Sequence, residues 1–329
     1  MTSIKNVQYD KTKGSSRLEF IISGKHINYI MVNTLRRVIL SEIPTYVFTE
    51  FTFNKNNSVF HNNFLKNQIQ NLPVWGIDNK LEYFDNSLKV KNVEAEEIED
   101  LEDNVELSVE KKVNSNSLEQ LTMYVDFENK SSDIYTVTTN DAKFYFAQKQ
   151  ISNPYPVPIQ LVKLQPKQTI NFSVVTSVGI EKQNSIYSPV SICVYDQQKD
   201  KDNKYLDNEY NFIIESRGQL SEGKIIHIAV LNLIKKLEDI LIQIPDNNED
   251  SGEIQINNED HTIGNLITHG LQNHKNIKFA GYNMPHPLEK RVIISYNLKS
   301  GKIKETIKSV INEFIEIYKD IDKKIEKVM

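Results

Sequence analysis

Residues 33–37, with the sequence Asn-Thr-Leu-Arg-Arg, form the stretch from which the fold of the first part of the chain can be inferred. Around it, between positions 27 and 39, apolar residues recur at intervals of three and four, which is the pattern of one helix face. Pro44 disfavours a helical backbone at Ile43, so the helix should end before it. The pattern predicts a helix over residues 27–41.

Three further helices are predicted toward the C-terminus. Residues 261–266, His-Thr-Ile-Gly-Asn-Leu, begin a helix over about residues 262–274. Longer apolar stripes predict helices over residues 221–244, with Ser221 as N-cap, and over residues 302–325.

The helix at residues 302–325 carries two adjacent apolar stripes. One stripe is enough to cover a small sheet, so the second needs another surface. The segment around it, residues 253–329, has little room for a core of its own. We therefore expect this helix to pack on its own sheet and also on helices of the first part of the chain.

Short alternating runs predict strands before, between and after these helices. A polar, turn-rich segment, Asp-Asn-Asn-Glu-Asp-Ser-Gly, separates the last two predicted domains. The fold class is therefore α+β. One discontinuous domain is predicted over residues 1–45 and 165–245, with a mainly β insert at residues 46–164. A linker at residues 246–252 then leads to a small domain at residues 253–329.

The composition is that of a globular chain of 329 residues with a formal net charge of −5, which disfavours direct binding to a nucleic-acid backbone. No apolar run approaches the roughly 18 residues needed to span a membrane, and the N-terminus lacks the apolar stretch of a secretory signal. Cys193 is the single cysteine, which excludes an internal disulfide and a thiolate zinc site. An acidic run at residues 94–103 is typical of a solvated loop.

An enzymatic function is not indicated. Ser-Gly-Lys at residues 300–302 and Glu-Gly-Lys at residues 222–224 lack the upstream glycine and the hydroxyl residue of a phosphate-binding loop. No run of aspartates offers a two-metal site. The histidines at positions 261, 269, 274 and 286 have no metal-ligand spacing. We expect no catalytic residue, no metal and no cofactor.

Two non-enzymatic alternatives remain open at this point. A sequence-specific DNA-binding factor would need a basic stripe or a helix-turn-helix pair, and the net charge opposes it. A free-standing chaperone or adaptor would differ from an assembly scaffold only in its partners.

The order of the motifs resembles a known family. Residues 33–37 and the following Ser-Glu-Ile-Pro-Thr resemble the α-like assembly subunit of cellular RNA polymerases. Residues 261–266, followed by Phe-Ala-Gly-Tyr and Met-Pro-His-Pro, resemble its smaller partner, the archaeal L or eleventh eukaryotic subunit. Other α-like stretches follow in the family's order at residues 57–60, 64–74, 164–168, 187–190 and 212–218. The chain resembles both partners fused, as in large cytoplasmic DNA viruses.

This resemblance implies two dimerisation modules paired intramolecularly through helices, so that the chain is a pseudo-heterodimer and not a homodimer. The implied function is a non-catalytic assembly scaffold of a viral DNA-directed RNA polymerase. The implied partners are its second-largest and largest subunits, and a small subunit resembling the tenth cellular one is a further candidate. DNA and RNA would be reached only through the complex, with no membrane contact. The expected location is the host cytoplasm and the virion, or the nucleus if the virus transcribes there.

Site residues follow from the same resemblance. Paired arginines are more often a solvated helix face, but the resemblance assigns Asn33, Arg36, Arg37 and Glu42 to the interface with the large subunits. Many relatives carry clustered cysteines in the insert, whereas this chain has none there. The apolar residues expected in the intramolecular dimerisation interface are Ile30, Leu35, Val38, Leu233, Leu237, Ile263, Leu266, Ile267, Ile307, Val310, Phe314 and Ile317.

Gly264 is unfavourable near the start of a helix on propensity alone. We expect a close approach of another backbone to explain it.

Overall fold

The computed structural model describes residues 2–12, 16–75, 120–147, 149–246, 249–286 and 289–329. By their contacts they divide into two compact units, one from residues 1–47, 71–83 and 178–329 and the other from residues 48–70 and 84–177. Within the first unit, we call the part before residue 247 the first half and the part from residue 249 onward the second half. The acidic run at residues 94–103 lies outside the described residues.

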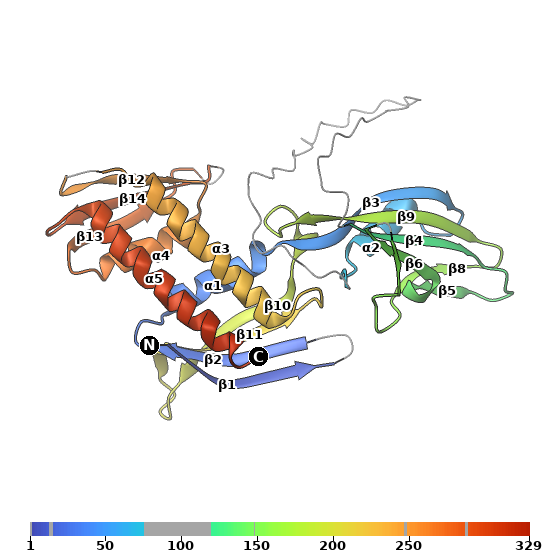
Figure 1. Cartoon of the computed structure of the whole chain (residues 1–329), viewed down its shortest axis with the longest axis horizontal. Coiled ribbons are helices and arrows are strands. Elements are labelled where there is room, and N and C mark those ends of the chain that lie inside the picture. Colours follow the sequence, from blue (N-terminus) through green and yellow to red (C-terminus); the bar gives the residue numbers. More distant parts are fainter. Residues whose placement is uncertain (1, 13–15, 76–119, 148, 247–248, 287–288) are drawn as a thin grey trace. The chain divides into compact units, whose positions relative to one another are not determined.

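The first half is a sheet with two helices, α1 and α3 (Figure 1). Its strands lie in the order β1-β2-β11-β10, and each pair is antiparallel. The Ser221 hydroxyl accepts a hydrogen bond from the Lys224 N–H at 3.4 Å and caps α3, as predicted. The elements are β1 (Thr2–Lys11), β2 (Ser16–Gly24), α1 (Tyr29–Ser41), β10 (Val190–Lys199), β11 (Tyr205–Ser216) and α3 (Glu222–Gln243).

The second half is a smaller sheet in the order β12-β14-β13, again with antiparallel pairs, together with α4 and α5. Its elements are β12 (Ser251–Asn257), α4 (His261–Gln272), β13 (Ile277–Asn283), β14 (Arg291–Leu298) and α5 (Ile303–Glu326). The predicted linker at residues 246–252 is too long by two residues, because Ser251 and Gly252 pair with Asn297 and Tyr296 in the sheet.

The two halves repeat one topology. In each, a strand is followed by a helix, then by two paired strands and a long closing helix, as β2-α1-β10-β11-α3 and β12-α4-β13-β14-α5. The order of strands within the sheets matches as well, β2-β11-β10 against β12-β14-β13. The first unit therefore consists of two copies of one module, which confirms the α+β class.

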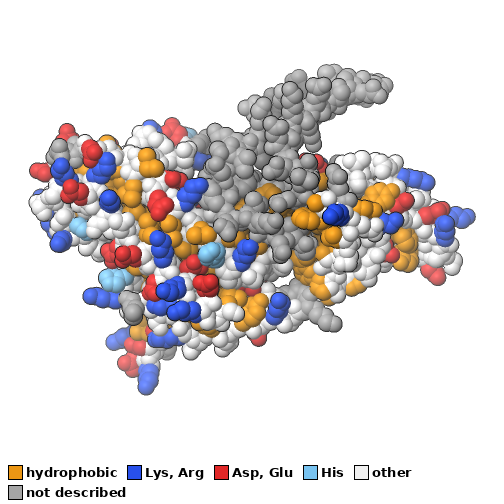
Figure 2. Space-filling view, viewed as in Figure 1, with side chains coloured by type: hydrophobic (Ala, Val, Ile, Leu, Met, Phe, Trp, Pro, Cys, Tyr) orange, Lys and Arg blue, Asp and Glu red, His pale blue; other side chains and the backbone are white. Residues whose placement is uncertain are grey.

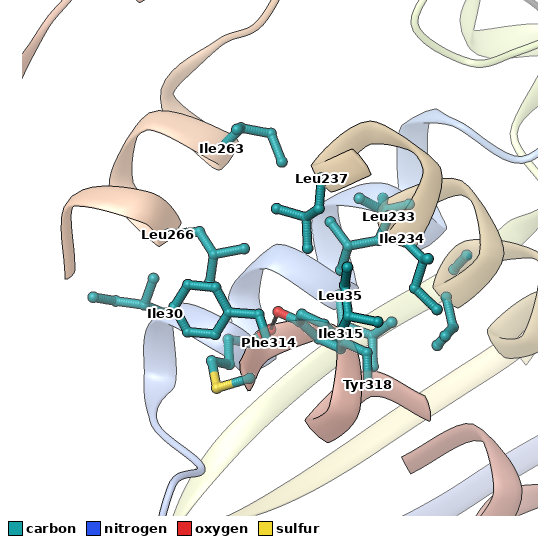
Figure 3. Packing of buried hydrophobic residues seen from close by; sticks show 14 of the residues in the cluster. Ile30, Leu35, Leu233, Ile234, Leu237, Ile263, Leu266, Phe314, Ile315 and Tyr318 are labelled. Atoms are coloured by element: carbon teal, nitrogen blue, oxygen red, sulfur yellow. Dashed lines mark hydrogen bonds between the residues drawn. The ribbon is translucent and has the colours of Figure 1, made fainter. Parts of the chain in front are cut away.

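The halves pack together through their helices, with α3 on α5 and α1 on α4. Each closing helix also reaches the other half, since α5 contacts β1 and α3 contacts β12. This is the second surface that the double stripe of α5 requires. Buried residues of both halves form one hydrophobic cluster, part of which is shown in Figure 3. Within it, the fully buried Tyr318 of α5 donates a hydrogen bond to the Met31 carbonyl of α1 at 3.1 Å.

The second unit is β-rich. Its larger sheet has the strand order β3-β9-β4-β6-β7, and β5 pairs with β8. Residues 165–177 belong to this unit, although the sequence places them in the discontinuous domain, because β9, which begins at Thr169, pairs with β4 and buries alternate side chains here. The elements are β3 (Thr45–Asn56), α2 (Asn62–Gln70), β4 (Leu121–Glu128), β5 (Tyr135–Thr138), β6 (Ala142–Phe146), β7 (Lys149–Ile151), β8 (Gln160–Leu164) and β9 (Thr169–Gly179).

Candidate functional site at the junction of the two halves

The two sequence motifs lie on helices that occupy equivalent places in the repeat, α1 and α4. Each helix begins at a side-chain cap. The Asn28 carboxamide oxygen accepts from the Met31 N–H at 3.1 Å, and an Asp260 carboxylate oxygen accepts from the Thr262 N–H at 2.8 Å. The motifs are thus held in the same register relative to their caps.

The contacts between α1 and α4 are nearly reciprocal. Arg37, nine residues after its cap, donates from Nε to the Thr262 hydroxyl at 2.7 Å. His269, nine residues after its own cap, has Nε2 at 3.3 Å from Nδ2 of Asn28. The tail of each helix therefore contacts the head of the other, as expected for a pseudo-twofold axis between them.

A cavity of about 110 Å³ lies between these helices. Asn33 and Asn265, each five residues after its cap, both line it. The His261 and Tyr282 rings meet edge to face at its rim, with centroids 5.8 Å apart. The lining comes from both halves and is mainly polar: Ile30, Asn33, Thr34, Arg37, His261, Thr262, Asn265 and Tyr282.

Arg36 and Arg37 point to different neighbours, as adjacent residues on a helix must. Arg36 donates from Nε to the Asn33 carboxamide oxygen at 3.1 Å, within the same helix. Within the part of the chain that the structure describes, neither guanidinium forms an ion pair with a carboxylate. Both guanidinium groups therefore have donors without a partner among the described residues, and the large-subunit interface stays a prediction.

Glu42 has a different environment from the one that the sequence suggests. Its carboxylate is 13 % exposed and lies 2.7 Å from Lys236 Nζ of α3 and 3.5 Å from Lys182 Nζ. Lys236 also lies 3.5 Å from Glu259, and Lys182 lies 3.0 Å from Asp260. We call these five residues the junction ion cluster. Since Glu42 is engaged within the chain, its geometry favours a role in joining the halves over contact with a large subunit.

Burial and charge act against each other in the junction ion cluster. Burial raises the pKa of Glu259 to about 7, because Lys236 lies closer to Glu42 and only partly offsets the desolvation. Burial would lower the pKa of Lys236, but Glu42 and Glu259 together raise it. Burial would also raise the pKa of Asp260, but Lys182 and the hydrogen bonds from Thr262 lower it.

A pH-dependent stability follows from Glu259. Its pKa is raised on folding, so the folded state binds this proton more tightly than the unfolded state, and stability falls as pH rises toward about 7. Relative to the wild-type chain, Glu259→Gln should gain about 3 kcal/mol in free energy of unfolding between pH 5 and pH 8. Trp75, the only tryptophan, lies in the first unit and donates to the Arg217 carbonyl at 3.1 Å, so its fluorescence during urea unfolding reports this free energy.

The matched control for this experiment is Glu238→Gln, which changes an exposed carboxylate of α3. It should follow the wild-type pH dependence. Parallel curves for Glu259→Gln and the wild-type chain from pH 5 to pH 8 would contradict the assigned environment of Glu259.

The residues expected in the intramolecular interface all lie in, or against, the shared hydrophobic cluster. Ile317 is only partly buried, and the others are 8 % exposed or less. Figure 3 shows side chains from α1, α3, α4 and α5 converging, among them Ile30, Leu237, Leu266 and Phe314. The structure thus brings these residues together, and their share in the strength of pairing stays a prediction.

Gly264 is explained by close packing, but side chains and not a backbone make the approach. A Cβ atom there would lie 2.9 Å from both Tyr282 Cδ2 and Val292 Cγ1. A larger residue would separate α4 from the sheet of the second half. The expected approach of another backbone is therefore wrong.

Several residues of the junction were missed by sequence reasoning, namely Lys182, Lys236, Thr262, Asn265 and Tyr282. The sequence did contain a signal for Thr262 and Asn265, because both belong to the motif at residues 261–266. That motif begins α4, the helix that contacts Arg37. Lys236 gave no such signal, since lysines beside an apolar stripe are usually solvated.

Metal chemistry and membrane insertion find no support among the described residues. In that part of the chain, no group of three or more histidine, cysteine, aspartate or glutamate side chains could hold a metal ion. No described helix is long and apolar enough to cross a membrane. Burial raises the pKa of the Cys193 thiol to about 12, against the opposing effect of Arg36, so this thiol is not a ready nucleophile. On the face shown in Figure 2, acidic and basic side chains are interspersed.

Comparison with known proteins places both halves in one family. Two models with the same description, the RNA polymerase Rpb3/Rpb11 dimerisation domain, match residues 19–237 and residues 251–324. The R470 protein of Acanthamoeba polyphaga mimivirus, named as a DNA-directed RNA polymerase subunit, is 24 % identical over 322 residues, covering 91 % of this chain and 88 % of that protein.

Shorter relatives match only part of this chain. The RNA polymerase subunit Rpo11 of Sulfurisphaera tokodaii is 36 % identical over 91 residues, covering 25 % of this chain and 98 % of that protein. A Caenorhabditis elegans protein named as subunit RPAC2 of RNA polymerases I and III is 37 % identical over 70 residues, covering 21 % of this chain and 49 % of that protein.

Proposed function

Because this chain belongs to the family of RNA polymerase Rpb3/Rpb11 dimerisation domains, we propose that it is the assembly platform of a viral DNA-directed RNA polymerase. Its two halves pair with each other and together recruit the second-largest and largest subunits. The observation that carries the proposal is the presence of two modules of this family on one chain, packed through α3 and α5 around one hydrophobic cluster. The family's domains belong to non-catalytic subunits, so the chemistry resides elsewhere in the complex.

The fusion of two modules has a thermodynamic consequence. A short tether between two binding partners gives an effective concentration of roughly millimolar, so pairing is nearly complete even when the untethered affinity is modest. Only a few residues separate α3, which ends at Gln243, from β12, which begins at Ser251. One chain thus takes the place of a heterodimer with fixed stoichiometry, and a homodimer is disfavoured.

The proposed recruiting surface is the exposed side of α1, with Asn33, Arg36 and Arg37. A guanidinium group forms planar, two-point contacts with carboxylates and carbonyls, and both arginines have donors without a partner among the described residues. Glu42 is left out because the junction ion cluster engages it. The likeness to the mimivirus protein supports a location in infected cells and in the virion.

The test is the double substitution Arg36→Ala with Arg37→Ala. We expect the chain to stay folded, because neither guanidinium is buried in the hydrophobic cluster, and its affinity for the second-largest subunit to fall at least ten-fold, about 1.4 kcal/mol. The measurement is binding of purified variants to the purified second-largest subunit, with Trp75 fluorescence as the check on folding.

Arg17→Ala is the matched control, since Arg17 lies on β2 and pairs with Glu19 and Glu215 at 3.3 and 3.5 Å. It should bind as the wild-type chain does. Normal binding by the double variant would remove α1 from the recruiting surface.

A further inference from the structure

The cavity between α1 and α4 is built by both halves and has an excess of hydrogen-bond donors. Only Nε of Arg37 is used, by Thr262, so the two terminal amino groups of its guanidinium have no partner among the described residues. The side chain of Asn265, on the opposite wall, likewise has no hydrogen bond to another described group. Asn33 has its carboxamide oxygen occupied by Arg36, which leaves its amino group as the available end.

Among the described residues, the lining of the cavity carries a positive charge and no negative one. None of the described residues that line it is acidic, whereas Arg37 is cationic. The nearest capping carboxylate, Asp260, is paired with Lys182 at 3.0 Å and accepts from the Thr262 N–H. The cavity also lies at the first turn of α4, where the helix dipole favours negative charge.

We infer that this cavity is a receptor for one carboxylate side chain, an aspartate or glutamate presented by the second-largest polymerase subunit. The guanidinium of Arg37 would pair with the carboxylate, and the amino groups of Asn33 and Asn265 would donate to it. A water molecule occupies about 30 Å³ in the liquid, so about 110 Å³ accommodates a carboxylate group after a few waters leave. The inference rests on the proposed function and specifies the chemistry of recruitment.

A consequence is that neither half alone forms the receptor. Arg37 and Asn33 come from the first half, whereas Asn265, Thr262 and His261 come from the second. Thr262 also holds Arg37 by the hydrogen bond to Nε, so the guanidinium is oriented only when the halves are paired. The large subunit would therefore bind the correctly folded pair in preference to a chain whose second half has not docked.

The test uses two substitutions at one position, with the full chain and the purified second-largest subunit. Asn265→Leu removes the amide donor and should weaken binding about ten-fold or more, since hydrogen bonds to charged groups contribute about 1.5–3 kcal/mol. Asn265→Asp is nearly isosteric and puts a negative charge on the wall of the cavity, so it should weaken binding further. Asn312→Asp makes the same charge change on the exposed face of α5, outside the cavity, and should bind as wild type.

Each outcome decides the inference. Unchanged or tighter binding by Asn265→Asp, in a chain with wild-type Trp75 fluorescence, would show that the occupant is not anionic and overturn it. A structure of the complex in which a group other than a carboxylate fills the cavity would also overturn it. A C-terminal carboxylate in that place would support carboxylate binding by the cavity but overturn its assignment to an aspartate or glutamate side chain. The Arg36 and Arg37 double variant could lose binding while both Asn265 variants retain it. In that case the proposed recruitment through α1 stands, and only the assignment of the cavity as a carboxylate receptor is wrong.

Discussion

Lys236→Ala should lower the free energy of unfolding of the first unit by about 3–5 kcal/mol at pH 7, the cost of leaving a buried charge without its partner. Lys236 Nζ lies 2.7 Å from Glu42 and 3.5 Å from Glu259, and the three side chains are 15 %, 13 % and 10 % exposed. Without the ammonium group, Glu42 keeps only Lys182, at 3.5 Å, and the pKa of Glu259 rises further because the Lys236 charge that lowers it is gone. Urea unfolding followed by Trp75 fluorescence measures the loss.

The control is Lys235→Ala, which removes the neighbouring exposed lysine of α3 and should change stability by no more than about 0.5 kcal/mol. The loss in Lys236→Ala should shrink at pH 5, where Glu259 is protonated in both the wild-type chain and the variant, so that only the pairing of Lys236 with Glu42 is lost. A Lys236→Ala variant as stable as the wild-type chain at pH 7 would mean that the junction ion cluster does not hold the halves together.

Leu237→Ala should cost about 2–5 kcal/mol, because it removes a completely buried side chain and leaves a cavity between packed helices. Leu237 lies on α3 in the cluster shared with α5, so the loss falls on the contact between the halves as well as on the first half. The expected result is an earlier urea transition and, in a chain cut at the connection between the halves, weaker retention of the second half.

Ile242→Ala on the same helix is the comparison, since its side chain is 83 % exposed and its removal should cost little. Equal stabilities of the Leu237 and Ile242 variants would contradict the assignment of α3 to the shared core.

The main helices could be predicted because their apolar residues recur at helical spacing over several turns. The double stripe of α5 also indicated a second packing surface, which α3 and β1 supply. The predicted domain and linker boundaries are wrong where strand pairing determines them. Ser251 and Gly252 have turn-rich neighbours yet pair in β12, and residues 165–177 join the second unit because β9 pairs with β4. The local composition of a strand does not show which distant segment of the chain it pairs with.

The sequence by itself indicated the two-module organisation, because the order of its motifs resembles two paired subunits of one family and because helix periodicity is a local property of the chain. Only the tertiary structure decided that Glu42 faces Lys236 and that Arg37 meets Thr262 beside a polar cavity. Electrostatic and hydrogen-bond contacts act over a few ångströms, and the residues that make them here stand 194 and 225 positions apart. Their meeting depends on how α1, α3 and α4 are placed by the packing of the apolar faces.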